Sequence, residues 1–296
     1  MKKVFFYGLI ILFAFILIGA GIAYHFLTKR TVGPYFDSKG VAIHYTDEGQ
    51  GVPVILLHGF AVNADLNWRR PKIAQMLTRH YRVITMDLRG HGLSGKPHEA
   101  DQYGAEVYQD VIRLMDHLKI EKAHVMGYSL GGFMALKLAS VYPERLISAM
   151  PLASGWENPD RSVFFQYMDK LVAALKAGKS VGPIGEAFGE ERKSSFLHKT
   201  WVKLMTGYFN DKMALIALME SLRALALTED EVRAIKLPMM TIVGSEDILL
   251  AGAKVLAEVA PNHHLIVVDN ADHVQTVYRA ETHATILEFL EVNSGN

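Results

Sequence analysis

A single serine stands among glycines where an apolar run meets a helical pattern. Gly127, Ser129 and Gly131 form a G-x-S-x-G pattern after the apolar run 123–126, and apolar residues at helical spacing follow over 130–141. A sharp turn from strand to helix lifts a serine side chain clear of a sheet and needs small residues two positions before and after it. A serine hydroxyl becomes a useful nucleophile only when a neighbouring base activates it. The pattern therefore predicts a nucleophilic Ser129 on an elbow formed with Gly127 and Gly131.

Candidates for a general base and an acid follow the serine along the chain. His273 comes four residues after the last apolar run, 264–269, and Asp247 comes three residues after the run before it, 238–244. The order Ser129, Asp247, His273 is the one expected when the serine sits on a strand-to-helix turn. We expect His273 to take the proton from Ser129 and to return it to the leaving group, while Asp247 fixes the imidazole tautomer. The adjacent Glu246 is an open alternative as the acid, although we favour Asp247.

A site for acyl transfer also needs donors for the oxyanion of the transition state, and losing one donor costs about 10²–10³ in rate. The backbone N–H of Leu130, directly after the serine, is one candidate. The loop after the apolar run 52–57 reads HGFAVN, and we assign the second donor to the backbone of Phe60. His58 is expected to hold this loop in place.

The elements that must position these residues alternate between strands and helices. The expected strands cover 41–45, 52–57, 81–88, 123–126, 146–153, 238–244 and 264–269. The expected helices cover 71–77, 105–118, 130–141, 251–259 and 280–292. Alternation over 41–45 is typical of an edge strand, whereas most later strands are apolar on both faces. The sequence therefore predicts an α/β fold in which helices cover both faces of a mostly parallel sheet, with the site beyond the carboxyl ends of its strands.

The segment 155–233 breaks this alternation, because it shows no convincing strand and has helical runs rich in Phe, Met and Leu. We predict that it forms a helical cap, or lid, inserted into a core made of 31–154 and 234–296. Methionine adapts to irregular apolar ligands, so the cap is expected to shape a pocket for an apolar acyl chain. Ordinary packing of the cap on the sheet would call for the same residues.

The N-terminal segment 1–30 is predicted to be a membrane anchor or a signal segment. Residues 4–27 carry no fixed charge, and basic residues flank them on both sides. As a helix they would be about 36 Å long at about 1.5 Å per residue, enough to cross a bilayer core of about 30 Å. We favour an uncleaved single-pass anchor with an extracytoplasmic catalytic domain. The alternative is a cleaved signal with a weak cleavage candidate at 21–23, which would make the protein secreted.

Composition narrows the classes of partner and of chemistry. The 296 residues carry 31 Lys and Arg against 31 Asp and Glu, and this formal charge of zero argues against nucleic-acid binding, which needs many cations facing phosphates. There is no cysteine, which excludes disulfides, thiolate nucleophiles, Cys-ligated zinc and iron–sulfur clusters.

Taken together, these motifs resemble those of the α/β-hydrolase superfamily. The resemblance rests on HGF at 58–60, DLRGHGLSGKP at 87–97, GYSLGG at 127–132, GSED at 244–247 and ADH at 271–273. It implies an eight-stranded, mostly parallel sheet with a variable lid, and no metal or organic cofactor. By resemblance, Ser129 is the nucleophile, Asp247 the acid and His273 the base, and the amides of Phe60 and Leu130 form the oxyanion hole.

The resemblance also indicates an activity. Members of the superfamily often hydrolyse carboxylic esters, and an anchored, capped serine hydrolase is similar to the membrane-bound monoacylglycerol lipases. Ser129 sets aside the epoxide hydrolases and haloalkane dehalogenases, which carry Asp at that position, and HGFAVN differs from the glycine-richer loop of the ring-cleavage-product hydrolases. Arg89 and His91 resemble positions that stabilise a loop.

We therefore predict a serine hydrolase that cleaves carboxylic esters through an acyl-enzyme intermediate and whose substrate is an acylglycerol or another lipid-like ester. Cofactor-free perhydrolysis or acyl transfer is the alternative, because it would use the same acyl-enzyme with a different acceptor. A hydrolase-fold receptor that binds a small molecule without turnover is a less favoured alternative, since no member of the triad is missing from the sequence.

Overall fold

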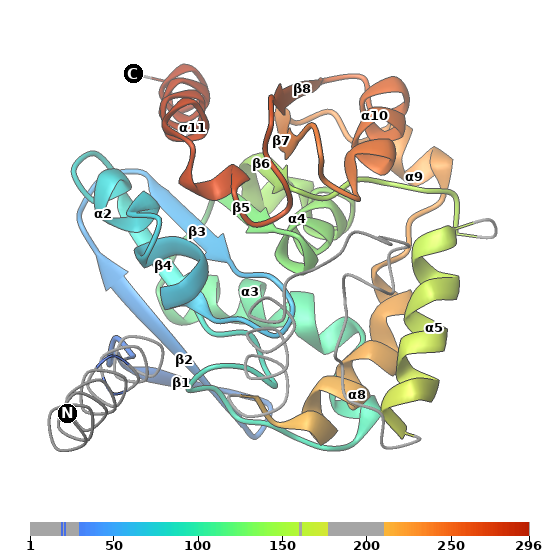
Figure 1. Ribbon diagram of the computed structural model, residues 1–296. Coiled ribbons are helices and arrows are strands. Elements are labelled where there is room, and N and C mark those ends of the chain that lie inside the picture. The colour runs from blue at the N-terminus through green and yellow to red at the C-terminus, as the bar shows by residue number, and fades with distance from the viewer. Residues whose placement is uncertain (1–18, 20, 22–29, 160–161, 177–209, 296) are drawn as a thin grey trace, which may run out of the picture. The chain divides into compact units, whose positions relative to one another are not determined.

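The computed structural model describes residues 19, 21, 30–159, 162–176 and 210–295. The chain divides into two compact units, Met1–Val32 and Gly33–Asn296. The second unit contains the sheet and every predicted site residue, and Figure 1 shows its elements coloured along the chain.

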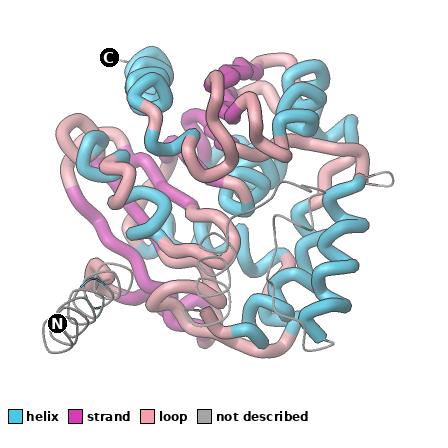
Figure 2. The backbone as a smooth tube through the Cα atoms, in the orientation of Figure 1, coloured by secondary structure: helices cyan, strands magenta, loops and turns pink. Residues whose placement is uncertain are grey.

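An eight-stranded sheet forms the centre of the second unit (Figure 2). Its strands are β1 (Tyr35–Ser38), β2 (Val41–Glu48), β3 (Pro53–Leu57), β4 (Arg82–Met86), β5 (Ala123–Tyr128), β6 (Leu146–Leu152), β7 (Met239–Gly244) and β8 (His263–Val268). The strand order is β1-β2-β4-β3-β5-β6-β7-β8, and β2 runs antiparallel to β1 and β4 while the other pairs are parallel. The predicted α/β fold with a mostly parallel sheet is confirmed.

Most strands occur where apolar runs predict them, because a strand covered on both faces must bury both sets of alternate side chains. β5 and β7 are buried at every position. The prediction of an edge strand at 41–45 is wrong, since this segment belongs to β2, the second strand of the sheet. The edge is β1, whose short sequence YFDS has no apolar run to reveal it.

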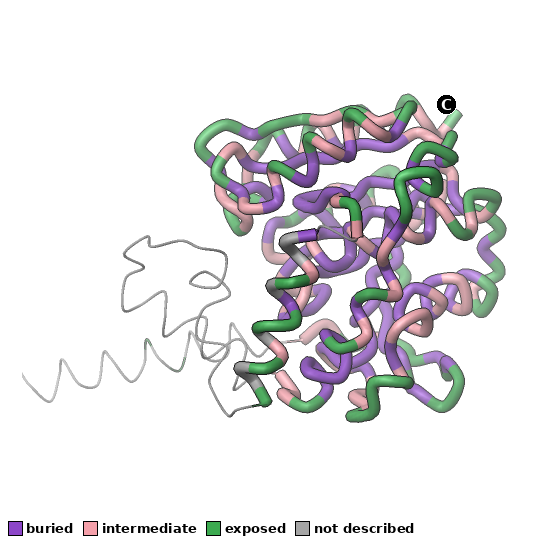
Figure 3. Tube along the Cα trace, turned by 90° about the vertical axis from the view of Figure 1, so that its right-hand side faces the viewer, coloured by how far each residue is buried: buried purple, intermediate pink, exposed green. Residues whose placement is uncertain are grey.

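Helices cover the sheet on both faces, as predicted. They are α2 (Ile73–Leu77), α3 (Ala105–His117), α4 (Leu130–Val141), α5 (Val163–Lys176), α8 (Lys212–Ser221), α9 (Glu229–Ala234), α10 (Leu250–Val259) and α11 (Ala280–Asn293). Ile55 and Leu57 of β3 contribute to the core shared with α3, α4 and α10, whereas Val54 and Leu56 contribute to the core shared with α2 and α11. This division follows from the alternation of side chains along a strand. Figure 3 shows buried residues along the strands and on the inner sides of these helices.

The described part of the predicted cap is helical. It comprises 155–159, 162–176 and 210–233, and these residues include no strand. Within it, α5 and α8 pack against each other. The remaining cap residues, 160–161 and 177–209, lie outside the described part of the chain. The division of the chain into core and cap therefore stays a prediction.

The predicted transmembrane anchor requires a correction. Among the described residues, no helix is both long and apolar enough to cross a bilayer, which stands against a membrane-spanning segment. Apart from Gly19 and Gly21, the segment 4–27 that prompted the prediction lies outside the described residues. The alternative of a cleaved signal falls on the same residues and stays a prediction.

Candidate active site

Ser129 occupies the sharp turn between β5 and α4. Its backbone dihedrals are φ 53° and ψ −113°, a conformation that residues other than glycine rarely adopt. Two backbone hydrogen bonds hold the turn, from Ser129 N–H to the Leu152 carbonyl of β6 at 2.9 Å and from Phe133 N–H to the Ser129 carbonyl at 3.1 Å. The side chain is half-buried. The strand-to-helix elbow predicted from the G-x-S-x-G pattern is present.

The glycines around Ser129 allow backbone segments to come into close contact. A β-carbon added at Gly127 would lie 1.9 Å from the Gly131 carbonyl oxygen, and one added at Gly131 would lie 2.2 Å from the Leu57 carbonyl oxygen. Both positions must therefore be glycine. Gly132 also allows a close approach, because a β-carbon there would lie 2.4 Å from Ser154 Oγ. It makes room for the chain that leaves β6.

The HGF loop, defined here as residues 58–61, follows β3 and lies against Ser129. A β-carbon added at Gly59 would lie 3.4 Å from the β-carbon of Ser129. On the side of the predicted cap, the Asn210 amide donates a hydrogen bond to the Ala61 carbonyl at 2.9 Å. The loop therefore connects the serine to the segment that leads into α8.

Hydrogen bonds hold this loop on both sides of Phe60. Gly59 N–H donates to Asn67 Oδ1 at 2.9 Å, and Ala61 N–H donates to His91 Nε2 at 3.1 Å. Ala61 has a φ of 57°, so the chain turns sharply directly after Phe60. The position of the intervening Phe60 amide is therefore fixed by its two neighbours.

The two predicted oxyanion donors share one property. Within the described part of the chain, the backbone N–H groups of Phe60 and Leu130 donate no hydrogen bond to protein atoms. Leu130 is also the first residue of α4, where the helix dipole favours negative charge. Both groups are thus available to a ligand, and their assignment as the oxyanion hole stays a prediction.

Two buried histidines hold the loops rather than offer a base. Leu88 N–H donates to His58 Nε2 at 3.0 Å, so the ring proton lies on Nδ1, which donates to the Gly59 carbonyl at 2.7 Å. In the same way, His91 Nδ1 donates to the Arg89 carbonyl at 3.2 Å. Burial lowers the pKa of His58, and burial together with the nearby His58 lowers the pKa of His91 to about 3. Both rings are neutral supports.

The carboxylate of Asp87 organises the loop that follows β4. It accepts hydrogen bonds from the backbone N–H groups of Ala64 at 3.0 Å and Leu93 at 2.9 Å, and it lies 3.1 Å from His44 Nδ1. Burial alone would raise the pKa of Asp87, but the His44 hydrogen bond, the nearby His58 and the two backbone donors lower it to about 2. Asp87 therefore joins the loops after β3 and β4 without being available for proton transfer.

Arg89 plays the structural part that the resemblance implies for it. Its guanidinium forms a two-point ion pair with Asp110 at 2.7 and 2.6 Å, and each side chain is about 1% exposed. Asp110 also accepts from Ser38 Oγ at 2.5 Å. The pair ties the loop after β4 to α3 and β1.

His273 and Asp247, which the sequence predicts to be the base and the acid, are in contact. His273 Nδ1 lies 3.0 and 2.9 Å from the two carboxylate oxygens of Asp247. The Asp247 side chain is fully buried, whereas 31% of the His273 side chain is exposed. Leu249 N–H donates to Asp247 Oδ1 at 2.9 Å, which fixes the carboxylate. The ring therefore turns Nδ1 toward the acid, and its Nε2 makes no hydrogen bond within the described part of the chain.

The structure distinguishes Asp247 from its neighbours as the partner of His273. Glu246 is exposed. Asp272 Oδ1 accepts from the backbone N–H groups of Val274 at 2.9 Å and Gln275 at 2.8 Å, which makes it a turn former. The carboxylate in contact with the imidazole is that of Asp247.

The link between Ser129 and His273 is not closed by a hydrogen bond among the described residues. Such contacts are often long in enzymes without substrate and shorten in the reacting complex. A third residue, which the sequence does not single out, connects the two. Tyr128 lies directly before the serine, and its hydroxyl donates to the His273 carbonyl at 2.5 Å.

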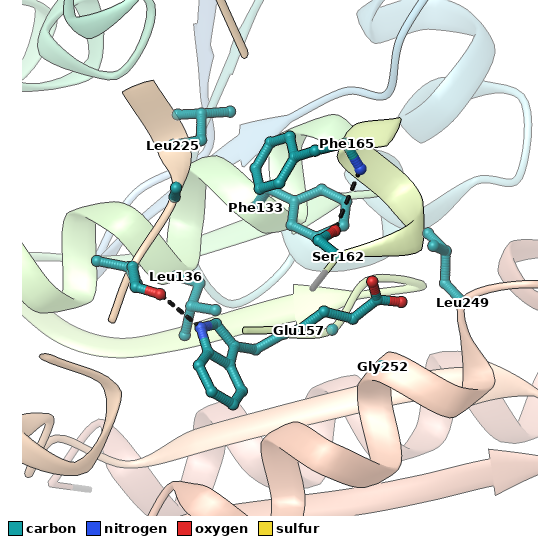
Figure 4. A pocket seen from close by; sticks show the side chains of 12 residues that line it. Phe133, Leu136, Glu157, Ser162, Phe165, Leu225, Leu249 and Gly252 are labelled. Carbon is teal, nitrogen blue, oxygen red and sulfur yellow. Dashed lines mark hydrogen bonds between the residues drawn. The ribbon is translucent and has the colours of Figure 1, made fainter. Parts of the chain in front are cut away.

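A largely apolar pocket lies beside the elements that present Ser129 and Asp247 (Figure 4). It holds about 470 Å³ of empty space, counted out to its open mouth. Phe133 of α4 and Phe165 of α5 contribute aromatic rings, and Glu157 contributes a carboxylate. None of the three predicted catalytic residues lines it directly. The other lining residues are Leu136, Gly155, Trp156, Ser162, Leu225, Ala226, Leu227, Leu249 and Gly252.

Within the described residues, no group of three or more His, Asp or Glu side chains is arranged to hold a metal ion. The loops at the carboxyl ends of the strands carry the Ser129 hydroxyl, the His273 imidazole with its carboxylate partner Asp247, and the backbone N–H groups of Phe60 and Leu130. These are groups suited to nucleophilic attack on an acyl carbon and to stabilising the oxyanion that results.

The chain is similar to known proteins over most of its length. The sequence pattern of the alpha/beta hydrolase fold matches residues 52–276. The AB hydrolase superfamily protein YfhM of Bacillus subtilis is 28% identical over 281 residues, 87% of this chain and 97% of that protein. The non-heme chloroperoxidase of Streptomyces lividans is 30% identical over 240 residues, 73% of this chain and 82% of that protein.

The chain is also similar to a protein of known structure. Est816, described as an N-acyl homoserine lactone degrading enzyme, is 25% identical with a TM-score of 0.65, and the match covers 86% of this chain and 99% of that chain. The matched range includes Ser129, Asp247 and His273. The chain therefore belongs to the α/β-hydrolase family.

Proposed function

We propose that the protein is a serine hydrolase that cleaves carboxylic esters through an acyl-enzyme intermediate. The observation that carries this proposal is the contact between His273 and the buried Asp247, on loops at the same edge of the sheet as the Ser129 elbow. A buried carboxylate on Nδ1 leaves Nε2 of the imidazole to act as the base.

The reaction would proceed in two halves. His273 takes the proton from Ser129 Oγ as the oxygen attacks the ester carbonyl, and the oxyanion is held by the N–H groups of Phe60 and Leu130. The imidazolium then gives its proton to the leaving alcohol, which departs and leaves an ester on Ser129. In the second half, His273 takes a proton from water, the resulting hydroxide attacks the acyl-enzyme, and the carboxylic acid leaves as Ser129 regains its proton.

The apolar pocket supports an apolar group on the substrate. Its lining is mainly aromatic and aliphatic, and two of its polar groups are already engaged, since Trp156 Nε1 donates to the Leu227 carbonyl and Ser162 Oγ accepts from Phe165 N–H. A hydrocarbon chain that leaves water for such a space gains roughly 0.8 kcal/mol for each buried methylene. We propose a lipid-like ester, of which an acylglycerol is one kind.

Turnover of p-nitrophenyl esters from acetate to palmitate tests this function on the full chain. Ser129→Ala should abolish turnover and labelling by a fluorophosphonate, while Ser221→Ala should retain both. Ser221 is a suitable control because it is half-buried and its hydroxyl donates to the Leu218 carbonyl in α8. A preference for longer chains would support a lipid-like substrate. Turnover that persists in Ser129→Ala, or neither turnover nor labelling of the unmodified chain, would contradict the proposal.

Perhydrolysis is a second candidate because a relative at 30% identity is named as a non-heme chloroperoxidase. Hydrogen peroxide would replace water in the second half of the reaction and attack the acyl-enzyme, so that the product is a peracid. Peracid formation from ethyl acetate and hydrogen peroxide, measured beside hydrolysis of the same ester, separates the two candidates. Formation that depends on Ser129 and exceeds hydrolysis at equal acyl donor would favour perhydrolysis.

A further inference from the structure

We propose that Tyr128 positions His273 relative to Ser129, so that one residue determines the positions of both the nucleophile and the base. This inference rests on the proposed serine hydrolase function and adds a positioning residue to it. Tyr128 ends β5 and directly precedes Ser129, so its backbone leads into the elbow. Its side chain reaches a residue 145 positions later in the sequence.

Two contacts join Tyr128 to His273. The phenol donates a hydrogen bond to the backbone carbonyl of His273 at 2.5 Å. The centroids of the Tyr128 and His273 rings lie 5.5 Å apart, and the ring planes are inclined at 48°. On another side, the Trp68 ring packs edge-on against Tyr128 at 6.4 Å. Tyr128 is about 5% exposed and Trp68 is fully buried, so the tyrosine ring has little room to turn.

The hydrogen bond fixes the main chain of the base, not its ring. Within its own loop, His273 is braced by bonds that Asp272 and Thr276 make locally. These local bonds shape the loop but do not connect it to β5. The hydrogen bond from Tyr128 supplies such a connection, and it complements the contact between Asp247 and Nδ1 of His273. Together the two contacts restrain both the backbone and the ring of His273.

The phenol is suited to act as a permanent donor. Burial, reinforced by the negative charge of Asp247, raises the pKa of Tyr128 well above its ordinary value. The hydroxyl therefore keeps its proton over the range in which a histidine base works. A carbonyl acceptor cannot donate in return, so the direction of the bond is fixed as well.

Loss of this bond should affect the rate more than substrate binding. Proton transfer requires donor and acceptor within about 2.6–3.2 Å in the reacting complex, and a misplacement of about 1 Å can cost 10²-fold. Tyr128→Phe keeps the ring between Trp68 and His273 and removes the hydroxyl alone. We expect kcat to fall about 10- to 100-fold while KM changes by less than about twofold, because the apolar pocket is not lined by Tyr128.

Tyr103→Phe is the matched control. Tyr103 is also buried, and its hydroxyl also donates to a backbone carbonyl, that of Pro97, at 2.7 Å. The two variants lose the same kind of bond, so their thermal unfolding temperatures should fall by similar amounts. A kcat unchanged in Tyr103→Phe and reduced in Tyr128→Phe would support the proposal. Equal kcat values in the two variants would overturn it.

A double-mutant cycle with His273→Ala shows whether Tyr128 acts through the base. The readout is the rate at which a fluorophosphonate labels Ser129. In the presence of His273, Tyr128→Phe should slow labelling by the same factor as kcat, and in the His273→Ala background it should have no further effect. An equal slowing in both backgrounds would mean that Tyr128 acts on the elbow itself, which would overturn the proposal.

The outcomes for the unmodified chain separate this inference from the proposed function. Absence of both turnover and labelling that depend on Ser129 would overturn both. Normal turnover in the unmodified chain together with normal turnover in Tyr128→Phe would overturn the positioning role alone and leave the serine hydrolase function in place.

Discussion

Replacing Asp247 by Asn should leave the fold intact and remove most of the activity. The Asp247 side chain is fully buried, and its two oxygens lie 3.0 and 2.9 Å from His273 Nδ1. Asparagine has nearly the same shape, and its amide oxygen can still accept the hydrogen bond that Leu249 N–H donates at 2.9 Å. Its amide NH₂ then faces Nδ1 and donates to it. This stabilises the tautomer with the proton on Nε2, which cannot accept a proton from Ser129.

The size of the effect follows from the loss of the correct tautomer and of the charge that stabilises the imidazolium. The corresponding change in a serine protease triad lowers kcat by about 10⁴. A tenfold loss corresponds to about 1.4 kcal/mol in the barrier, so the expected cost in Asp247→Asn is about 5 kcal/mol. KM should change little, because Asp247 does not line the apolar pocket and acts only once proton transfer begins.

Steady-state hydrolysis of p-nitrophenyl esters measures this effect, and Glu246→Gln is the matched control. Glu246 is the adjacent carboxylate, and it is exposed. Neutralising it should change kcat by less than about twofold, since exposed charges are screened by solvent. A kcat above a tenth of the unmodified value in Asp247→Asn would refute the reasoning. A loss in Glu246→Gln as large as that in Asp247→Asn would assign the acid to the wrong carboxylate.

Three further outcomes follow from other contacts. Gly131→Ala should lower the unfolding free energy in urea by about 3 kcal/mol or more, because its added carbon would lie 2.2 Å from the Leu57 carbonyl oxygen. In the control Gly252→Ala, the added carbon would lie 3.6 Å or more from its neighbours, so the unfolding free energy should fall by less than about 1 kcal/mol. Asn210→Ala should lower kcat/KM about tenfold with an unchanged melting temperature, because it releases the HGF loop; an unchanged kcat/KM would contradict this link. The unfolding free energy should fall as pH drops from about 6.5 toward 3, because the pKa of His91 is about 3 in the folded chain and the unfolded chain binds the proton first. His91→Asn should reduce the dependence of the unfolding free energy on pH by up to about 1.4 kcal/mol per pH unit. An unaltered dependence on pH would refute the assignment of this effect to His91.

The fold can be predicted from the sequence where burial determines the residue types. β5 and β7 are covered on both faces, so their residues form continuous apolar runs that mark the strands. β1 lies at the edge with one face exposed, and its four residues carry too short a pattern to be detected. The π-helix Asp65–Arg69 likewise has no sequence pattern of its own, since its single turn is held by the loop and the core around it.

The site can be predicted where its chemistry depends on a local pattern. The elbow around Ser129 needs Gly127 and Gly131 because backbone atoms come into contact there. This requirement produces a recognisable glycine pattern within five residues of sequence. The roles of Tyr128 and Asn210 depend on contacts with residues 145 and 149 positions away in the sequence. Since many buried tyrosines and loop asparagines make no such contact, neither residue type nor spacing identifies them.

The three histidines near the site differ in whether they hold a loop in place or are suited to proton transfer. His58 uses both ring nitrogens, one accepting a backbone N–H and the other donating to a backbone carbonyl, and burial keeps it neutral. His91 is held in the same way, so neither ring has an atom left for a substrate. His273 differs in two respects that concern proton transfer. Its side chain is partly exposed, and its Nδ1 is held by a carboxylate, whose negative charge stabilises the positive charge that the ring acquires with a second proton. Of these three rings, only that of His273 can take up a proton from Ser129 without breaking a hydrogen bond to the backbone, and this favours the loop after the last strand over the HGF loop as the place of the proposed base.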